Sequence, residues 1–320
     1  MSGIDFVAYD PSGLVGHLPT SWGGKLRVTS DFLLALVQAV TKGLLTGMVY
    51  GLMALGLSVI FGVMRVVNFA HGEMMIVGMY LAWAAFEYFQ VSPLLSLPLI
   101  AALFFVMGYA LQRGLISPFI GRPEHQQFLL LLGVALIIVN VCLAVVGPDS
   151  HGVQLEAQFD SYQVGPLVLD AVRLHAAIGA VVIAGLLWLF FTRTRTGKSI
   201  RAAADNHMGA LVVGLDVRRL YAVTFGVGAA CVGAAGALMI TIIPVTPSLA
   251  AEYTLLAFVI VIVGGLGSMT GALAGGLLIG VSEAVAGLLV EPSLKSMFSF
   301  GLLILVLLLR PQGLLGKRGA

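Results

Sequence analysis

Residues 253–290 read YTLLAFVIVIVGGLGSMTGALAGGLLIGVSEAVAGLLV, and Glu283 is the only charged residue among them. A membrane-spanning helix needs about 20 predominantly apolar residues, because each residue advances it by about 1.5 Å. The stretch is too long for one span, and the glycine-rich residues 264–271 interrupt it. We therefore expect two membrane helices here, separated by a glycine-rich turn.

The composition of the whole chain supports a membrane protein. Of its 320 residues 59% are hydrophobic and only 10% are charged, whereas soluble domains carry roughly 25% charged residues. The net charge of +2 gives no polyanion-binding surface. These values exclude a soluble enzyme, a disordered chain and a nucleic-acid binder, and they predict an all-α, polytopic helical membrane protein.

Other apolar stretches provide the remaining spans. Residues 66–86 contain Asn68, His71 and Glu73, so this stretch is expected to be either a span or a re-entrant segment. The total is eight to nine transmembrane helices within a membrane domain of residues 32–318. Residues 1–31 form an N-terminal extension that lacks a signal-peptide core and is expected to be irregular. The further stretches expected to span are 43–64, 88–112, 126–148, 174–192, 220–251 and 296–309.

The distribution of charge predicts the orientation, because short cytoplasmic loops are enriched in Lys and Arg. The connection 192–220 carries six cations and is expected inside, whereas 148–172 carries four acids with Arg and Lys absent, and is expected outside. The C-terminal tail is expected inside. For the N-terminal side two arrangements remain open: nine full crossings would place Lys25, Arg27 and Lys42 outside, and a re-entrant 66–86 would place them inside.

Glycines recur at four-residue spacing in two places, which puts them on one helix face. Such a face lets a second backbone approach closely, which is the main way that helices pack in lipid. The contact could lie inside the subunit, at a subunit interface or along a pathway. The glycines are Gly43, Gly47 and Gly51, and Gly267, Gly271 and Gly275.

A polar motif stands inside apolar sequence at Asn68, His71, Gly72 and Glu73. Ionisable groups at membrane depth are costly, so they normally pair or line a polar cavity. One interpretation is a helix start at the interface, with Asn68 as its cap and Glu73 near the positive helix end. Others are a structural pivot beside a pathway, or direct contact with a solute. Glu283 is expected to be paired or to face a cavity.

The cationic connection is predicted to contain one short amphipathic helix, Ser199 to Gly214, lying across the cytoplasmic face. Its cations could contact lipid, or the helix could dock a soluble partner. For docking, Ala203 and Gly209 are small enough to enter a cleft, and Met208 and Leu211 could be apolar anchors. The residues singled out are Arg201, Ala203, Asp205, Met208, Gly209, Leu211 and Gly214.

Patterns typical of catalysis are missing from the sequence. Gly197-Lys198-Ser199 resembles part of a phosphate loop, but Thr192 stands where the motif requires its first glycine. The histidines lack metal-protease spacing, and Gly-x-Ser-x-Gly is absent. Cys142 and Cys231 lie in apolar runs and are interpreted as core residues. We expect no catalytic residue, no metal site and no cofactor.

Several motifs together resemble the permease subunits of bacterial ABC importers for branched-chain amino acids, specifically the first of the two paired permeases. The resemblance covers roughly residues 33–316 and is more specific for the family than for the solute. The matching motifs are Gly56–Gly62, Val67–Glu73, Ala203–Asn206, Val213–Asp216, Val263–Ser268 with Gly271–Ala272, and Arg310–Leu314.

The resemblance implies a non-enzymatic subunit of the bacterial plasma (inner) membrane that moves branched-chain or related small amino acids inward by alternating access. It implies that residues 199–214 form a coupling helix. The implied partners are ATP-binding subunits, a second permease, a soluble substrate-binding protein and the lipid bilayer, with no nucleic acid. Two alternatives remain: a permease of the same family for urea or short amides, and an ion-coupled secondary transporter. A passive channel would need a ring of selective polar groups, which the spans lack.

Overall fold

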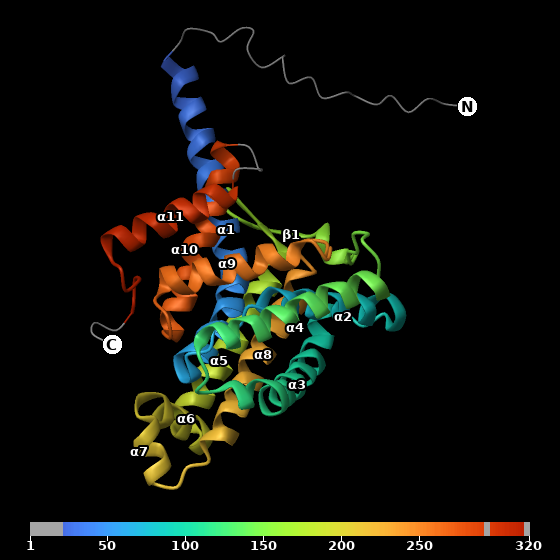
Figure 1. The fold of residues 1–320 in the computed structure, drawn as a ribbon. Helices are drawn as coiled ribbons and strands as arrows, with labels where there is room; N and C mark the ends of the chain where they lie inside the picture. The colour runs from blue at the N-terminus through green and yellow to red at the C-terminus, as the bar shows by residue number, and fades with distance from the viewer. Residues whose placement is uncertain (1–21, 291–294, 317–320) are drawn as a thin grey trace.

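The computed structural model describes residues 22–290 and 295–316. Within them the chain is almost entirely helical, with a single two-stranded sheet between α4 and α5 (Figure 1). The α-helices are α1 (Trp22–Met64), α2 (His71–Phe89), α3 (Pro93–Leu111), α4 (Glu124–Val145), α5 (Ala171–Arg193), α6 (Arg195–Asp205), α7 (His207–Val212), α8 (Val217–Met239), α9 (Leu249–Gly264), α10 (Met269–Leu289) and α11 (Lys295–Leu309). The all-α, polytopic fold is confirmed.

Six described segments are long and apolar enough to cross a membrane. They are Asp31–Met64, Pro93–Phe119, His125–Val145, Ala171–Arg193, Val217–Met239 and Met269–Leu289. The segment 93–119 continues α3 through a π-helical turn, η2 (Gln112–Ile116), and a 3₁₀ turn, η3 (Ser117–Phe119). Leu249–Gly264 and Ser296–Leu309 are apolar but shorter, and α2 is a further helix of 19 residues. A total of eight or nine spans stays a prediction.

Helix α8 is the centre of the bundle, with 83% of its apolar window buried inside the protein. Residues 227–237 read VGAACVGAAGA, and these small side chains let α1, α2 and α3 pack closely against it. A Cβ on Gly228 would lie 2.7 Å from the carbonyl oxygen of Gly56. Close packing holds helices together in lipid, where apolar burial between helices adds little. By contrast, only 17% of the α4 window is buried, so α4 is peripheral.

The α4–α5 connection contains a 3₁₀ turn, η4 (Glu156–Gln158), and a hairpin of β1 (Ser161–Val164) and β2 (Leu167–Asp170). The strands are antiparallel, with Ser161 opposite Asp170, and Gly165 turns between them at φ 63°. His151, earlier in this connection, pairs with Val245 between α8 and α9 through backbone hydrogen bonds of 3.0 and 2.8 Å. These two connections therefore share one end of the bundle, while α6 and α7 lie at the opposite end (Figure 1).

The acidic connection lies beside the first part of α1. Lys42 lines a small hollow together with Gln158, Asp160 and Asp170. Asp170 caps α5 and pairs with Arg173 at 3.3 Å, and the Arg173 guanidinium also donates to the Thr46 hydroxyl at 3.2 Å. Lys42 is thus at the same end as the acidic connection, which favours the arrangement with nine crossings over the re-entrant one.

Two sequence-based boundaries were wrong. Residues 22–31, expected to be irregular, are helical and belong to α1, while residues 1–21 lie outside the described part of the chain. The stretch 220–251, expected to be one span, is helical only to Met239 before α9 begins at Leu249. Pro244 and Pro247 interrupt the helix there because proline lacks an N–H, and Val245 pairs with His151 instead.

The predicted break within residues 253–290 is confirmed, since α9 ends at Gly264 and α10 begins at Met269. Gly265 turns the chain at φ 106°, in a region that favours glycine. The C-terminal tail packs on this turn: the N–H of Leu314 donates to the carbonyl of Val263 at 2.8 Å, and that of Leu315 to Gly264 at 3.0 Å. Two of the motifs that carried the family resemblance are therefore adjacent in space.

Candidate functional site

The polar motif begins where α1 ends. Residues 65–70 are non-helical, and Arg65 adopts φ 54°. Asn68 is fully buried, and its Oδ1 accepts a hydrogen bond from the N–H of Ala70 at 3.1 Å. The N-cap residue of α2 is Ala70. The interpretation of Asn68 as a helix cap at the interface was therefore wrong, because its amide closes a buried turn instead.

His71 joins α2 to the interior of α1. Its Nε2 lies 2.9 Å from the carbonyl oxygen of Met53, and the residue is fully buried. A carbonyl oxygen can only accept, so Nε2 must carry the proton. Nδ1 has no hydrogen-bond partner among the described residues. The imidazole thus connects the start of α2 to the backbone of α1 inside the bundle.

Gly72 and Glu73 join α2 to α9 through one hydroxyl. The Thr254 Oγ1 accepts from the N–H of Gly72 at 2.8 Å and donates to Oε2 of Glu73 at 2.8 Å. A Cβ on residue 72 would overlap the backbone of Ala250 and Thr254, so only glycine fits without rearrangement. The motif is an enclosed junction of α1, α2 and α9, with Glu73 only 6% exposed. Sequence reasoning located this motif but missed Thr254, which carries no local signal.

Glu283 is paired, which is one of the two expectations for it. The Tyr50 hydroxyl donates to Oε2 at 3.1 Å, and the Ser299 hydroxyl donates to Oε1 at 3.0 Å. These donors come from α1 and α11, so the carboxylate on α10 holds three helices together. Both donors were missed in the sequence because they are more than ten residues away.

The first glycine group faces α10. A Cβ on Gly43 would lie 2.6 Å from the carbonyl oxygen of Gly280, and one on Gly47 would lie 2.7 Å from that of Gly276. Gly51 faces Leu273, at 3.2 Å from its Cα. Contacts this short are possible only without side chains at these positions. These glycines therefore pack α1 on α10 inside the subunit.

The second group faces a different helix. A Cβ on Gly275 would lie 2.5 Å from the carbonyl oxygen of Ile260, and one on Gly271 would overlap that of Gly264, so both pack on α9. The expectation that Gly267 shares this helix face was wrong. Gly267 precedes α10, adopts φ 77° and approaches Gly62 of α1 instead.

The segment 199–214, expected on the cytoplasmic face, contains two helices and not the single one expected. α6 ends at Asp205, and Asn206 breaks the helix at φ −147° and ψ 97°. The Asn206 Oδ1 then accepts from the N–H of Gly209 at 2.8 Å and starts α7. Asparagine is a strong N-cap, which explains why a new helix begins here. Gly214 follows α7 at φ 81°, as expected of a stop.

The faces of these helices also differ from the expectation. Ala203, predicted to be on a docking face, is only 2% exposed, because α6 packs it inward together with Gly197 and Ile200. Arg201 and Asp205 on α6 are exposed. On α7, Met208 is 68% exposed and Leu211 is 47% exposed.

Helix α7 is attached to α8 by His207, whose Nδ1 lies 3.1 Å from the Tyr221 hydroxyl. Gly209, predicted to enter a cleft, packs against the side chain of its own cap, Asn206. The exposed apolar surface of α7 extends through Val212 and Val213, which sequence reasoning did not single out. The described segment thus presents four apolar side chains at the end of the bundle opposite the hairpin.

A family model matches residues 39–307, and its description is branched-chain amino acid transport system / permease component. The chain belongs to this family. The match includes the buried polar motif, the glycine contacts, α6 and α7. This permease therefore belongs to a family of transport proteins, not of enzymes. Separately, among the described residues no group of three or more His, Cys, Asp or Glu side chains could hold a metal ion.

Curated relatives agree along nearly the full length. This permease is 29% identical over 296 residues to the high-affinity branched-chain amino acid transport system permease protein BraD of Pseudomonas aeruginosa, covering 88% of this chain and 96% of the relative. It is 29% identical over 303 residues to LivH of Escherichia coli K12, covering 90% and 98%. It is 28% identical to a probable LivH of Methanocaldococcus jannaschii, covering 83% and 88%. No solved structure matches the chain.

Proposed function

We propose that this chain is the transmembrane subunit of an ABC importer of the plasma (inner) membrane, moving branched-chain amino acids inward by alternating access. The solute class rests on the relatives, which are named as branched-chain amino acid transport permeases. In this proposal ATP-binding subunits, a second permease and a soluble substrate-binding protein are the partners. Urea or a short amide is the alternative solute.

The observation that carries the proposal is the exposed apolar surface of α7, made of Met208, Leu211, Val212 and Val213. An apolar patch at the cytoplasmic end of a membrane protein is unfavourable in water, so a partner or the lipid interface must cover it. The attachment of α7 to α8 through His207 and Tyr221 supports cover by a partner protein. A force on α7 would reach the central helix, to which α1, α2 and α3 are packed.

The chemistry of the bundle suits a mechanical role. The buried motif at residues 68–73 joins three helices by hydrogen bonds to Met53 and Thr254, and Glu283 joins another three. Such junctions hold helices as rigid groups, which rigid-body movement during transport requires. The close glycine contacts of α10 with α1 and α9 add to this packing. In this proposal the motif at residues 68–73 is a pivot beside the solute pathway.

The test is leucine uptake and subunit capture with Met208→Glu and Leu211→Glu, using the full chain coexpressed with its ATP-binding partner. We expect both variants to keep normal membrane abundance but to lose the ATP-binding subunit and uptake. Val164→Glu, which replaces an exposed valine of the opposite hairpin, is the matched control and should behave normally.

Normal uptake and capture in the α7 variants would disprove the coupling assignment. Uptake that survives a hydrolysis-deficient ATP-binding subunit but is abolished by a protonophore would show an ion-coupled secondary carrier instead. Parallel uptake of labelled urea and acetamide distinguishes the alternative solutes, because a leucine permease should transport neither.

A further inference from the structure

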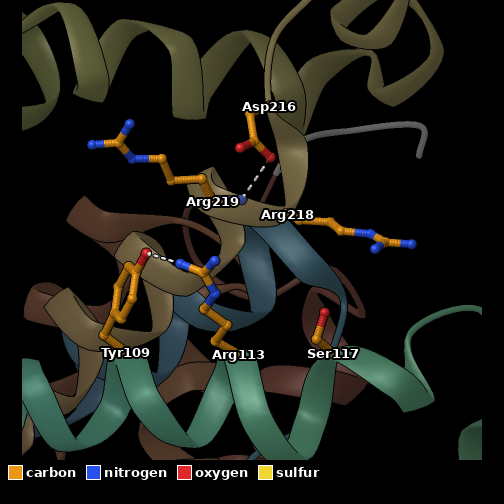
Figure 2. A pocket seen from close by; sticks show the side chains of 6 residues that line it. All are labelled: Tyr109, Arg113, Ser117, Asp216, Arg218 and Arg219. Carbon is orange, nitrogen blue, oxygen red and sulfur yellow. Dashed lines mark hydrogen bonds between the residues drawn. The ribbon is translucent and has the colours of Figure 1, made fainter.

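A cleft of about 600 Å³ lies at the end of the bundle expected to be cytoplasmic, and its lining includes none of the residues of the buried polar motif or of the α7 surface. Its two sides come from the end of the 93–119 segment and from the start of α8 (Figure 2). Three of its six lining residues are arginines. The lining residues are Tyr109, Arg113 and Ser117 on one side and Asp216, Arg218 and Arg219 on the other.

The first side of the cleft is one face of the helical segment 93–119. Tyr109, Arg113 and Ser117 are four residues apart and point toward the start of α8 (Figure 2). Near the end of this row the chain is π-helical over Gln112–Ile116, a geometry often found at functional sites. The Arg113 Nη1 donates to the Tyr109 hydroxyl at 3.1 Å, which orients the guanidinium toward the cleft.

Positive charge dominates the cleft. The one carboxylate, Asp216, is engaged as the N-cap of α8, where Oδ1 accepts from the backbone N–H of Arg219 at 3.1 Å. Among the described residues, no carboxylate lies within ion-pair distance of any of these three arginine side chains. The salt bridge in the described part of the chain is Arg173–Asp170. Guanidinium groups bind phosphate oxygens through pairs of parallel hydrogen bonds. A phosphate group therefore suits this arginine-rich lining.

The surroundings favour a lipid phosphate over a soluble one. The helical segment that ends in the cleft is only 22% buried, and it exposes Leu99 (73%) and Val106 (63%) along its length. In a membrane these side chains face acyl chains, so a phospholipid beside α3 would have its headgroup at the level of the cleft. Basic pockets between membrane helices on the cytoplasmic side are known to hold anionic headgroups.

We propose that this cleft binds the phosphate-bearing headgroup of an anionic glycerophospholipid of the cytoplasmic leaflet. The lipid would bridge α3 and the start of α8, and it would neutralise Arg113, Arg218 and Arg219. This site is separate from the α7 surface and does not depend on which solute is transported.

The test uses the full-length chain in detergent, titrated with phosphatidylglycerol or phosphatidylcholine of identical acyl chains and read by native mass spectrometry. We expect the chain to bind phosphatidylglycerol preferentially. Each arginine near a membrane surface contributes about a 5-fold gain in affinity for anionic lipid, so Arg113→Gln with Arg218→Gln should weaken binding roughly 25-fold. Phosphatidylcholine binding should not change.

Arg193→Gln with Arg195→Gln is the matched control, because it removes two exposed cations from the same end of the protein outside the cleft. This control should bind phosphatidylglycerol like the unmodified chain, and both double variants should have the same melting temperature. Equal losses in the two double variants, or equal affinity of the unmodified chain for the two lipids, would overturn the proposal.

Two further results would also overturn it. Displacement of phosphatidylglycerol by millimolar inorganic phosphate would show that the cleft takes free phosphate. Unchanged lipid binding together with loss of the ATP-binding subunit in Arg113→Gln with Arg218→Gln would show a protein contact instead.

Discussion

The backbone N–H of Gly72 donates a hydrogen bond to the side-chain hydroxyl of Thr254 at 2.8 Å, across 182 residues of sequence. The same hydroxyl donates to Glu73, so one oxygen satisfies both an unpaired N–H of the first turn of α2 and a buried carboxylate. Helix N-termini leave such N–H groups without partners. A side chain from α9 therefore completes the start of α2.

Thr254→Val should destabilise the protein, because it keeps the shape of the side chain but removes both hydrogen bonds. An unsatisfied buried polar group costs about 1–3 kcal/mol, and more when it is charged. We expect a lower melting temperature and lower membrane abundance. Thr254→Ser keeps the hydroxyl and should remain close to the unmodified protein. A valine variant as stable as the serine variant would show that the junction contributes little.

Gly271→Ala should also destabilise the protein, because the added Cβ would overlap the carbonyl of Gly264. Forcing a methyl group into a tight contact typically costs 1–3 kcal/mol, about the scale of overpacking in other cores. Gly185→Ala is the control, since a Cβ at this helical position of α5 meets nothing within 4 Å. The control should be neutral or stabilised by up to about 1 kcal/mol. Melting temperatures of the purified variants compare the two, and equal values would contradict the close contact.

Ala203→Glu and Met208→Glu should fail in different ways. Ala203 is buried inside the subunit, so a carboxylate there would be desolvated without a partner, at a cost of several kcal/mol. We expect its membrane abundance to fall. Met208 is 68% exposed, so its replacement should leave abundance normal and affect only docking. Quantitative immunoblotting of membranes measures this difference. Normal abundance of Ala203→Glu would place Ala203 on an open face.

Single cysteines at Gln158, Lys42 and Lys198 should report the orientation, because all three positions are exposed. The first two share one end of the bundle, and we expect an impermeant thiol reagent to label them from outside intact cells. Lys198→Cys should be labelled only after the cells are opened. Both native cysteines, Cys142 and Cys231, are buried, so the background should be low. Outside labelling of Lys198→Cys, or protection of Lys42→Cys, would refute the topology.

The class of fold, the break at residues 264–268 and the family could all be predicted from the sequence, because each depends on local composition or a contiguous motif. An apolar stretch of about 20 residues predicts a membrane helix. A glycine cluster within a longer apolar stretch predicts a turn, because glycine adopts positive φ readily. The same local reasoning gave pairing as one of two expectations for Glu283 and placed Gly214 at the end of the segment 199–214.

Partners distant in sequence were decided only by the tertiary structure. Thr254 at Gly72, Tyr50 and Ser299 at Glu283, and the α9 backbone at Gly271 leave no periodic signal in their own segments. Likewise, the inward side of Ala203 followed from the packing of α6, which buries Gly197, Ile200 and Ala203 together. A helical pattern shows which residues share a face, but the packing of neighbouring helices determines what that face meets.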